Sequence, residues 1–234
     1  MVESVPAIRR LRAASYDAVP EGRGVDVGCG RGSVVAELRA RGRDAVGVDA
    51  GRDLVAGARA RYPGCAFEVG NAVDLPFPDG SLAWYRAERL YLHLPDPRRA
   101  LAEALRVLEV GGRLVSVEPD MSSVVVSSGD PAVSRAILDA YPDSMLDGRV
   151  GSRMPDLVRE AGFGNVTCAA VPVLIDDLAL ATPTMIDPPV TAALAAGSVD
   201  TATVRRWYAE LERQQARGTF LIACLFFLTR AERP

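Results

Sequence analysis

Residues 25–33, with the sequence VDVGCGRGS, determine the fold that the chain is expected to adopt. A short apolar strand runs directly into a helical pattern, and glycine occupies every second position of the turn between them, at Gly28, Gly30 and Gly32. Glycine accepts the positive φ of a tight turn, and without a Cβ it lets a ligand lie against the main chain. The following helix directs its unpaired N–H groups at the same turn. The turn therefore predicts a ligand-binding site at the end of the first strand.

A second strand, at 45–48, ends in Asp49. Its separation from the glycines is close to that at which a carboxylate meets ribose hydroxyls in nucleotide-binding βαβ units. A dinucleotide fingerprint would place its third glycine at the position of Ser33, whereas this chain has it at Gly32. The spacing is thus tighter than in a dinucleotide site.

The rest of the first half alternates between strand and helix patterns. After a lead-in helix at 7–18, strands are expected at 24–27, 45–49, 66–69, 82–86 and 113–118, with helices at 32–41, 52–61 and 98–108. This alternation predicts an α/β fold, a Rossmann-like doubly wound sheet with helices on both faces. Right-handed crossovers place the ligand crevice along the edge where the parallel strands end.

The regular alternation of strand and helix patterns ends after residue 118. Helices are expected at 131–141, 154–161 and 201–217, and strands at 166–175 and 219–229, with a proline-rich stretch at 181–189. Long excursions between strands are rarely idle loop in a compact domain. We therefore expect one domain over 1–234, in which 1–22 form the lead-in segment, 24–119 the binding core, and 120–155 and 176–217 a helical cover over the crevice.

The overall composition restricts the class of protein and its partners. The 234 residues are 49% hydrophobic and 24% charged with a net charge of −3, which supplies no basic surface for nucleic acid. Four cysteines, at 29, 65, 168 and 224, are scattered without metal-ligand spacing, and this is typical of reduced cytosolic thiols. The first ten residues, MVESVPAIRR, lack the apolar segment of a signal peptide, and no apolar run reaches the roughly 18 residues of a membrane span. We expect a cytoplasmic protein, monomeric or homodimeric, without a metal, a membrane or a nucleic-acid partner.

Five motifs in order carry a resemblance to a known family: DVGCGRG at 26–32, GVD at 47–49, GNAVDLPFPDGSL at 70–82, RLYLHLPDPRRAL at 89–101 and RVLEVGGRLVSVEPD at 106–120. They resemble the class I S-adenosylmethionine-dependent methyltransferases, and most closely the small-molecule group similar to the ubiquinone and menaquinone biosynthesis methyltransferases. The resemblance covers about 24–119 strongly and the final strand pair more loosely. It implies a seven-stranded, mostly parallel sheet whose last strand is antiparallel.

The resemblance also implies a cofactor, S-adenosylmethionine, with S-adenosylhomocysteine as its product. Asp49 would accept hydrogen bonds from both ribose hydroxyls, and Arg86 or Arg89 would lie near the methionine carboxylate or the mouth of the substrate site. The other residues implied at the cofactor are Asp26, Gly28, Cys29, Gly30, Gly32, Ala50, Asn71 and Ala72. Asn71 departs from the aspartate that is usual there, but its carbonyl can accept from the adenine amino group. Alternatively, Asn71 caps the following segment.

Methyl transfer from a sulfonium is an in-line displacement that depends on alignment and the exclusion of water, so a base is needed only for a poorly ionised acceptor. Three candidates for that base follow strands four and five: His93, Glu118 and Asp120. Each could instead cap a turn. The expected substrate contacts are Tyr16, Arg89, Tyr91 and Trp207, with ordinary packing as the alternative for the three aromatic residues.

The sequence therefore predicts an enzyme that transfers a methyl group from S-adenosylmethionine to an oxygen, nitrogen or carbon of a small, fairly apolar metabolite in a biosynthetic pathway. Two alternatives stay open. The fold could serve a cyclisation or rearrangement without methyl transfer, since strong candidate bases are few. The chain could also be a non-catalytic partner subunit, although the intact glycines and Asp49 argue against decay of the site.

Overall fold

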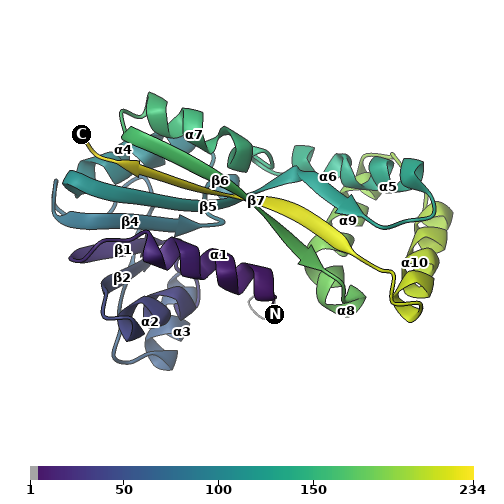
Figure 1. The fold of residues 1–234 in the computed structure, drawn as a ribbon, viewed down its shortest axis with the longest axis horizontal. Coiled ribbons are helices and arrows are strands. Elements are labelled where there is room, and N and C mark those ends of the chain that lie inside the picture. The colour runs from purple at the N-terminus through teal and green to yellow at the C-terminus, as the bar shows by residue number, and fades with distance from the viewer. Residues whose placement is uncertain (1–4) are drawn as a thin grey trace.

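The computed structural model describes residues 5–234, so the first four residues of the expected lead-in segment lie outside it. Seven strands form one sheet in the order β3-β2-β1-β4-β5-β7-β6. The strands β1 to β5 pair in parallel, and β7 runs antiparallel to both β5 and β6. The sheet predicted from the sequence, mostly parallel with an antiparallel last strand, is confirmed (Figure 1).

The strands have the bounds β1 Arg23–Val27, β2 Asp44–Asp49, β3 Ala66–Val69, β4 Leu82–Glu88, β5 Leu108–Val126, β6 Gly164–Ile175 and β7 Ile222–Glu232. The helices flanking the sheet are α1 Pro6–Asp17, α2 Ser33–Ala40, α3 Arg52–Arg61, α4 Pro97–Val107 and α7 Val150–Glu160. Helices α1, α2 and α3 lie on one face of the sheet, and α4 and α7 lie on the other (Figure 1). Each face carries its own apolar core, as a doubly wound sheet requires.

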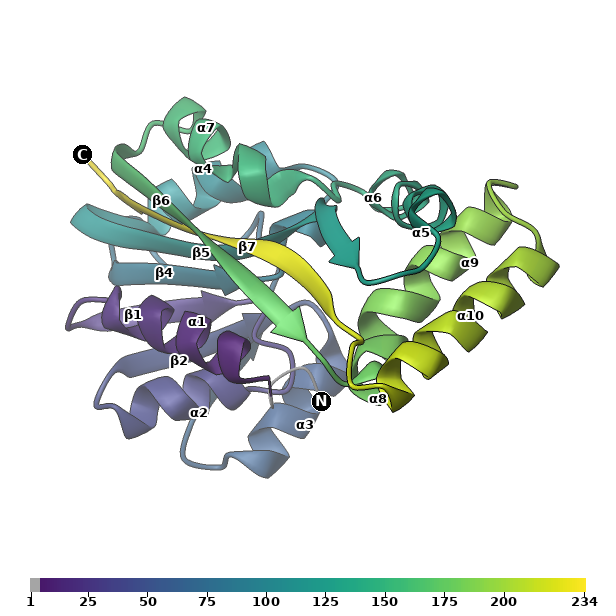
Figure 2. The same ribbon diagram turned by 45° about the vertical axis from the view of Figure 1, so that its right-hand side comes forward.

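A second group of helices lies beyond the edge at which the parallel strands end (Figures 1 and 2). We call it the helical lobe, and its members are α5 Pro131–Leu138, α6 Ala140–Asp143, α8 Leu178–Ala181, the π-helical turn η3 Thr182–Ile186, α9 Asp187–Ala195 and α10 Thr201–Ala216. The lobe comes from the two segments after β5 and β6, which confirms the expected origin of the helical cover.

The strand β5 is much longer than the strand expected at 113–118, and it carries the chain into the lobe. Its pairing with β4 ends at Val117, whereas its pairing with β7 continues to Val126. Pro119, which follows the strand expected at 113–118, therefore lies where only β7 borders β5. A proline is tolerated at such an edge because the unpaired side needs no N–H group.

The proline-rich stretch 181–189, which the sequence did not assign to a helix, is occupied by η3 and α9. Its prolines lie in the first turn of these elements: Pro183 is the second residue of η3, and Pro188 and Pro189 are the second and third residues of α9. The N–H groups of a first helical turn have no partner inside the helix, so proline loses nothing there. These helix starts place Met185 and Pro188 beside the sheet.

Candidate active site

The glycine turn between β1 and α2 is attached to the end of β2. The N–H groups of Gly28 and Cys29 donate to the carbonyl of Val48 at 2.8 and 3.1 Å. Gly28, Gly30 and Gly32 have φ angles of +74°, +52° and +80°, in the left-handed region that favours glycine. The turn expected from the sequence therefore exists, and the backbone geometry explains the choice of residue.

The two later glycines of this turn have different surroundings. A Cβ added at Gly32 would lie 2.5 Å from the Phe67 ring, so this position is needed for packing between α2 and β3. A Cβ added at Gly30 would meet no atom within 4 Å. Gly30 therefore borders open space, as a position that a ligand approaches should.

Asp49, at the end of β2, stands directly opposite Gly30. Its Oδ2 accepts the Gly30 N–H at 2.8 Å, and its Oδ1 accepts the Gly51 N–H at 2.8 Å. Each carboxylate oxygen keeps a further lone pair for a hydroxyl donor. Open space at Gly30 beside a half-buried carboxylate fits the ribose of an adenosine-containing cofactor. The site is thus compatible with S-adenosylmethionine.

The remaining residues expected at the adenine are less specifically arranged. Asn71 is exposed, and its Oδ1 accepts the Val73 N–H at 3.2 Å, which is the capping contact offered as the alternative. Ala72 is buried, and Ala50 is exposed just beyond Asp49. The carbonyl of Asp49 accepts the Gly70 N–H at 3.1 Å, so the ends of β2 and β3 meet here.

Arg86 is fully buried under the site, in a network of charged side chains. Its Nη1 donates to Asp26 at 2.7 Å, and its Nη2 donates to Glu88 at 2.6 Å. Its Nε donates to the Ser15 hydroxyl of α1 at 3.0 Å, and Arg12 of α1 also pairs with Glu88 at 3.0 Å. The structure corrects the expectation that Arg86 lies near the methionine carboxylate, because its donors are bound inside the protein. Asp26 likewise serves this network.

Arg12 and Glu88 were not among the residues expected at the site, although the sequence contains a signal for both. Glu88 follows Arg86 in a strand that is otherwise apolar, and charges buried in a central strand need partners. Arg12 lies on the same helical face as Ile8 and Ser15, which are buried. A search for partners of the strand charges would therefore have found this residue.

Glu118 is fully buried at the end of the β4–β5 pairing. Its Oε1 accepts the N–H groups of Leu90 and Tyr91 at 2.8 and 3.0 Å, and its Oε2 has no partner within residues 5–234. Burial raises the pKa of Glu118 to about 7, against the opposing effect of the backbone N–H donors. Glu118 is therefore a positioning residue for the loop after β4, and it does not line the cavity described below.

Asp120 also fills a local structural role. Its Oδ1 accepts the N–H and the hydroxyl of Ser122, at 2.9 and 2.5 Å, and its side chain does not line the cavity. His93 differs from both carboxylates, because it lies in the short helix η2 Tyr91–His93 at the cavity wall. Partial burial and then the nearby Arg89 guanidinium lower the pKa of His93, so the imidazole is neutral at pH 7 and can accept a proton.

A cavity of about 470 Å³ begins at Gly28 and extends between the carboxyl edge of the sheet and the helical lobe. Its polar wall includes Glu88, the last residue of β4, and Arg89 and His93, which follow β4. Its apolar wall includes side chains from α1, β5, β7 and η3, namely Ile8, Met121, Phe226 and Met185. Both the core and the lobe contribute, which places the lobe as a cover over the crevice, as expected from the sequence.

The three aromatic residues expected at the substrate are not brought to this cavity. The Tyr16 hydroxyl donates to Glu37 of α2 at 2.8 Å, and the Tyr91 hydroxyl donates to the Tyr85 hydroxyl at 3.2 Å. Trp207 is buried inside the lobe, where its Nε1 donates to Ser134 at 2.9 Å. Packing is the role that the structure gives to all three, whereas Arg89 does line the cavity.

Comparison with known proteins agrees with this geometry. Residues 25–116 match the family model described as a methyltransferase domain. Over these residues the chain is similar to the class I S-adenosylmethionine-dependent methyltransferases. A demethylmenaquinone methyltransferase of Renibacterium salmoninarum is 34% identical over 110 residues, covering 47% of this chain and 46% of the relative. An uncharacterized protein of transposon TN4556 from Streptomyces fradiae is 32% identical over 226 residues, covering 93% of this chain and 64% of the relative. The chain thus spans less than two thirds of each of these relatives.

Solved methyltransferase-fold structures resemble the whole chain. A methyltransferase candidate from Bacillus halodurans superposes with a TM-score of 0.63 at 20% identity, covering 95% of this chain and 98% of that one. The [4+2]-cyclase SpnF superposes with a TM-score of 0.58 at 24% identity, covering 96% and 81%. At these identities the likeness shows a shared fold, including the lobe-bearing second half.

Two further observations concern membrane-spanning helices and metal ligands in this chain. Within residues 5–234, every helix is too short or too polar to span a bilayer. In the same part of the chain, no three His, Cys, Asp or Glu side chains converge as metal ligands would.

Replacement of Arg86 by methionine tests the buried network. Arg86→Met leaves Asp26 and Glu88 buried without their shared partner, and we expect a loss of about 3–5 kcal/mol in the free energy of unfolding, measured with urea. The control is Arg39→Met, which removes the exposed pair with Asp44 and should cost about 1 kcal/mol or less. Equal losses in the two variants would contradict the structural role of Arg86.

Glu118→Gln tests the raised pKa of Glu118. Because this pKa is higher in the folded chain, its contribution to stability is complete below about pH 4.5 and is lost as the pH rises through about 7. Glutamine keeps the acceptor for the loop and does not titrate. Between pH 5 and 8 the wild type should lose up to about 3 kcal/mol relative to the variant, in urea unfolding at a series of pH values. Parallel pH profiles would show that Glu118 titrates normally.

Proposed function

We propose that this chain transfers the methyl group of S-adenosylmethionine to an oxygen, nitrogen or carbon of a small, fairly apolar metabolite. The observation that carries the proposal is the cavity that begins at Gly28 and continues between largely apolar walls. Its volume of about 470 Å³ is in the range of small-molecule sites. Residues of the helical lobe form part of the cavity wall, and this favours a small acceptor over a macromolecule.

Some residues of the chain would bind the cofactor, and others would align the acceptor with it. Asp49 would hold the ribose hydroxyls, and the open backbone at Gly30 would let the cofactor lie close. When bound, S-adenosylmethionine supplies an activated methyl group on its sulfonium. The apolar side chains of Met121 and Phe226 exclude water from the acceptor, and alignment in such a site supplies much of the rate of a displacement.

His93 is the residue we propose as the base for an acceptor hydroxyl. It lines the cavity and is neutral at pH 7, because its pKa is lowered. Glu118 and Asp120 are engaged by backbone and hydroxyl donors, which makes them poorer candidates. A biosynthetic role, a cytoplasmic location and a monomeric or homodimeric state remain part of the proposal.

Gly30→Val tests the cofactor half of the proposal. The valine side chain would enter the space beside Asp49, so we expect the affinity for S-adenosylhomocysteine to fall at least about 100-fold in calorimetry. Gly42→Val is the matched control, since Gly42 also has a positive φ, of +78°, and no atom within 4 Å of an added Cβ, but lies before β2. It should change the affinity less than twofold. Unchanged binding in Gly30→Val would show that the cofactor lies elsewhere.

The mass of the product tests the reaction. The protein is incubated with S-adenosylmethionine and a panel of apolar phenols, enols and amines, and the products are read by mass spectrometry. Methyl transfer adds one CH₂ to the acceptor and releases one equivalent of S-adenosylhomocysteine. A product of unchanged mass would favour a cyclisation or rearrangement, the alternative for which the cyclase SpnF provides a fold-level parallel. Turnover by the isolated chain would exclude a non-catalytic partner subunit.

A further inference from the structure

Arg89, the first residue after β4, has a backbone that is held in an uncommon conformation. Its φ is +54°, a conformation that residues other than glycine rarely adopt. Its N–H donates to the carbonyl of Val117 at 2.9 Å. The next two N–H groups, of Leu90 and Tyr91, donate to Glu118. Three consecutive bonds to β5 therefore fix the position of Arg89, and strain of this kind is typically retained at functional sites.

The charge of Arg89 is poorly balanced by its neighbours. Its Nε is 3.8 Å from Glu88, a carboxylate that already receives Arg12 at 3.0 Å and Arg86 at 2.6 Å. Burial alone would raise the pKa of Glu88, but the three guanidinium groups lower it, so Glu88 is ionised. Within residues 5–234, Glu88 therefore gives Arg89 only a long contact, because its two shorter ion pairs are with Arg12 and Arg86. The Arg89 side chain is 40% exposed.

The cavity wall adjoining this cluster is suited to an apolar group. Beyond Arg89 and His93, the lining includes Leu92, Met121, Met145 and Phe226. Among the lining residues that the structure describes, Glu88 is the one carboxylate, and it is already paired with arginine. A cationic acceptor would find no unpaired carboxylate among these residues. An anion could form a charge-assisted hydrogen bond with the Arg89 guanidinium.

We propose that Arg89 forms an anion subsite, so that the acceptor of this enzyme is an apolar acid whose carboxylate or comparable anionic group pairs with Arg89 while its apolar body fills the cavity. This inference rests on the proposed function and adds the chemical class of the acceptor. It assigns Arg89 to acceptor binding, whereas the sequence alone left Arg89 near either the methionine carboxylate or the mouth of the substrate site.

The experiment uses two fluorescent probes that differ in one group. 8-Anilino-1-naphthalenesulfonate is an apolar anion, and N-phenyl-1-naphthylamine is the same ring system without the sulfonate. Both are titrated into the full chain saturated with S-adenosylhomocysteine, and S-adenosylhomocysteine binding is measured separately by calorimetry. The wild type should bind the anionic probe at least about 10-fold more tightly than the neutral one. Thr184→Trp, which adds volume at the lobe wall of the cavity, should weaken both probes and so place them in it.

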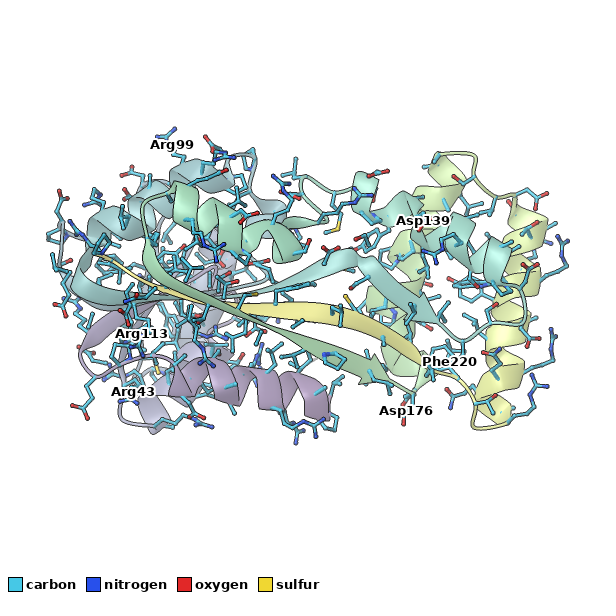
Figure 3. All side chains as sticks on the ribbon, turned by 45° about the horizontal axis from the view of Figure 1, so that its top comes forward. Arg43, Arg99, Arg113, Asp139, Asp176 and Phe220 are labelled. Atoms are coloured by element: carbon cyan, nitrogen blue, oxygen red, sulfur yellow. The ribbon has the colours of Figure 1, made fainter. Side chains whose placement is uncertain are left out.

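Arg89→Gln is the deciding variant. It should lower the affinity for the anionic probe about 10-fold, and change the affinities for the neutral probe and for S-adenosylhomocysteine less than twofold. The matched control is Arg99→Gln, which removes the same charge from α4, where Figure 3 shows Arg99 at the outer surface, far from the lobe. This control should change none of the three affinities.

Three results would overturn the inference. Equal affinity of the wild type for the two probes would show that the site has no preference for an anion. Equal weakening of both probes by Arg89→Gln would assign Arg89 to packing. Loss of S-adenosylhomocysteine affinity in Arg89→Gln, with the probe preference intact, would assign Arg89 to the cofactor. Failure of the wild type to bind S-adenosylhomocysteine would instead contradict the proposed function. The calorimetric measurement of this binding does not depend on the probes.

Discussion

The arrangement of the site depends on the buried pairing of Arg86 with Asp26 and Glu88. These side chains come from the two adjacent strands β1 and β4, and Arg12 and Ser15 extend the network to α1. Burying charged groups is costly unless each finds a partner, so the network fixes where the two strands and the helix stand relative to one another. The glycine turn follows β1 and the loop with Arg89 follows β4. The network therefore also determines where these two parts of the cavity wall lie.

A second constraint comes from β5, which serves the core and the lobe at once. Its Glu118 fixes the loop that carries Arg89 and His93, and its continuation past Pro119 leads into the helical lobe (Figure 2). Cofactor contacts are therefore expected on one side of the cavity, from β1 and β2, and acceptor contacts on the other, from the loop after β4 and the lobe. This division is what a displacement reaction needs, because the donor and the acceptor must approach from opposite sides.

The sequence predicted the sheet well, because short apolar strands separated by amphipathic helices have one stable arrangement. It failed where context overrides local signals. The expected strand ended at residue 118, before Pro119, yet β5 continues to Val126. The proline-rich stretch 181–189 was not assigned to a helix, yet η3 and α9 occupy it. The sequence placed the candidate site residues at the correct edge of the sheet. It could not predict the direction in which each side chain points. Arg86 and Glu118 belong to the right strands, but their partners are contributed by segments remote in sequence.

We infer that the turn at Gly30 and the carboxylate of Asp49 form the cofactor site. Hydrogen–deuterium exchange with and without S-adenosylhomocysteine tests this assignment, because the exchange rate reports on each backbone segment of the unmodified chain. We expect slower exchange at residues 28–32 and 49–51 when S-adenosylhomocysteine is bound. Unchanged exchange in these two segments, with protection confined to the helical lobe, would contradict it.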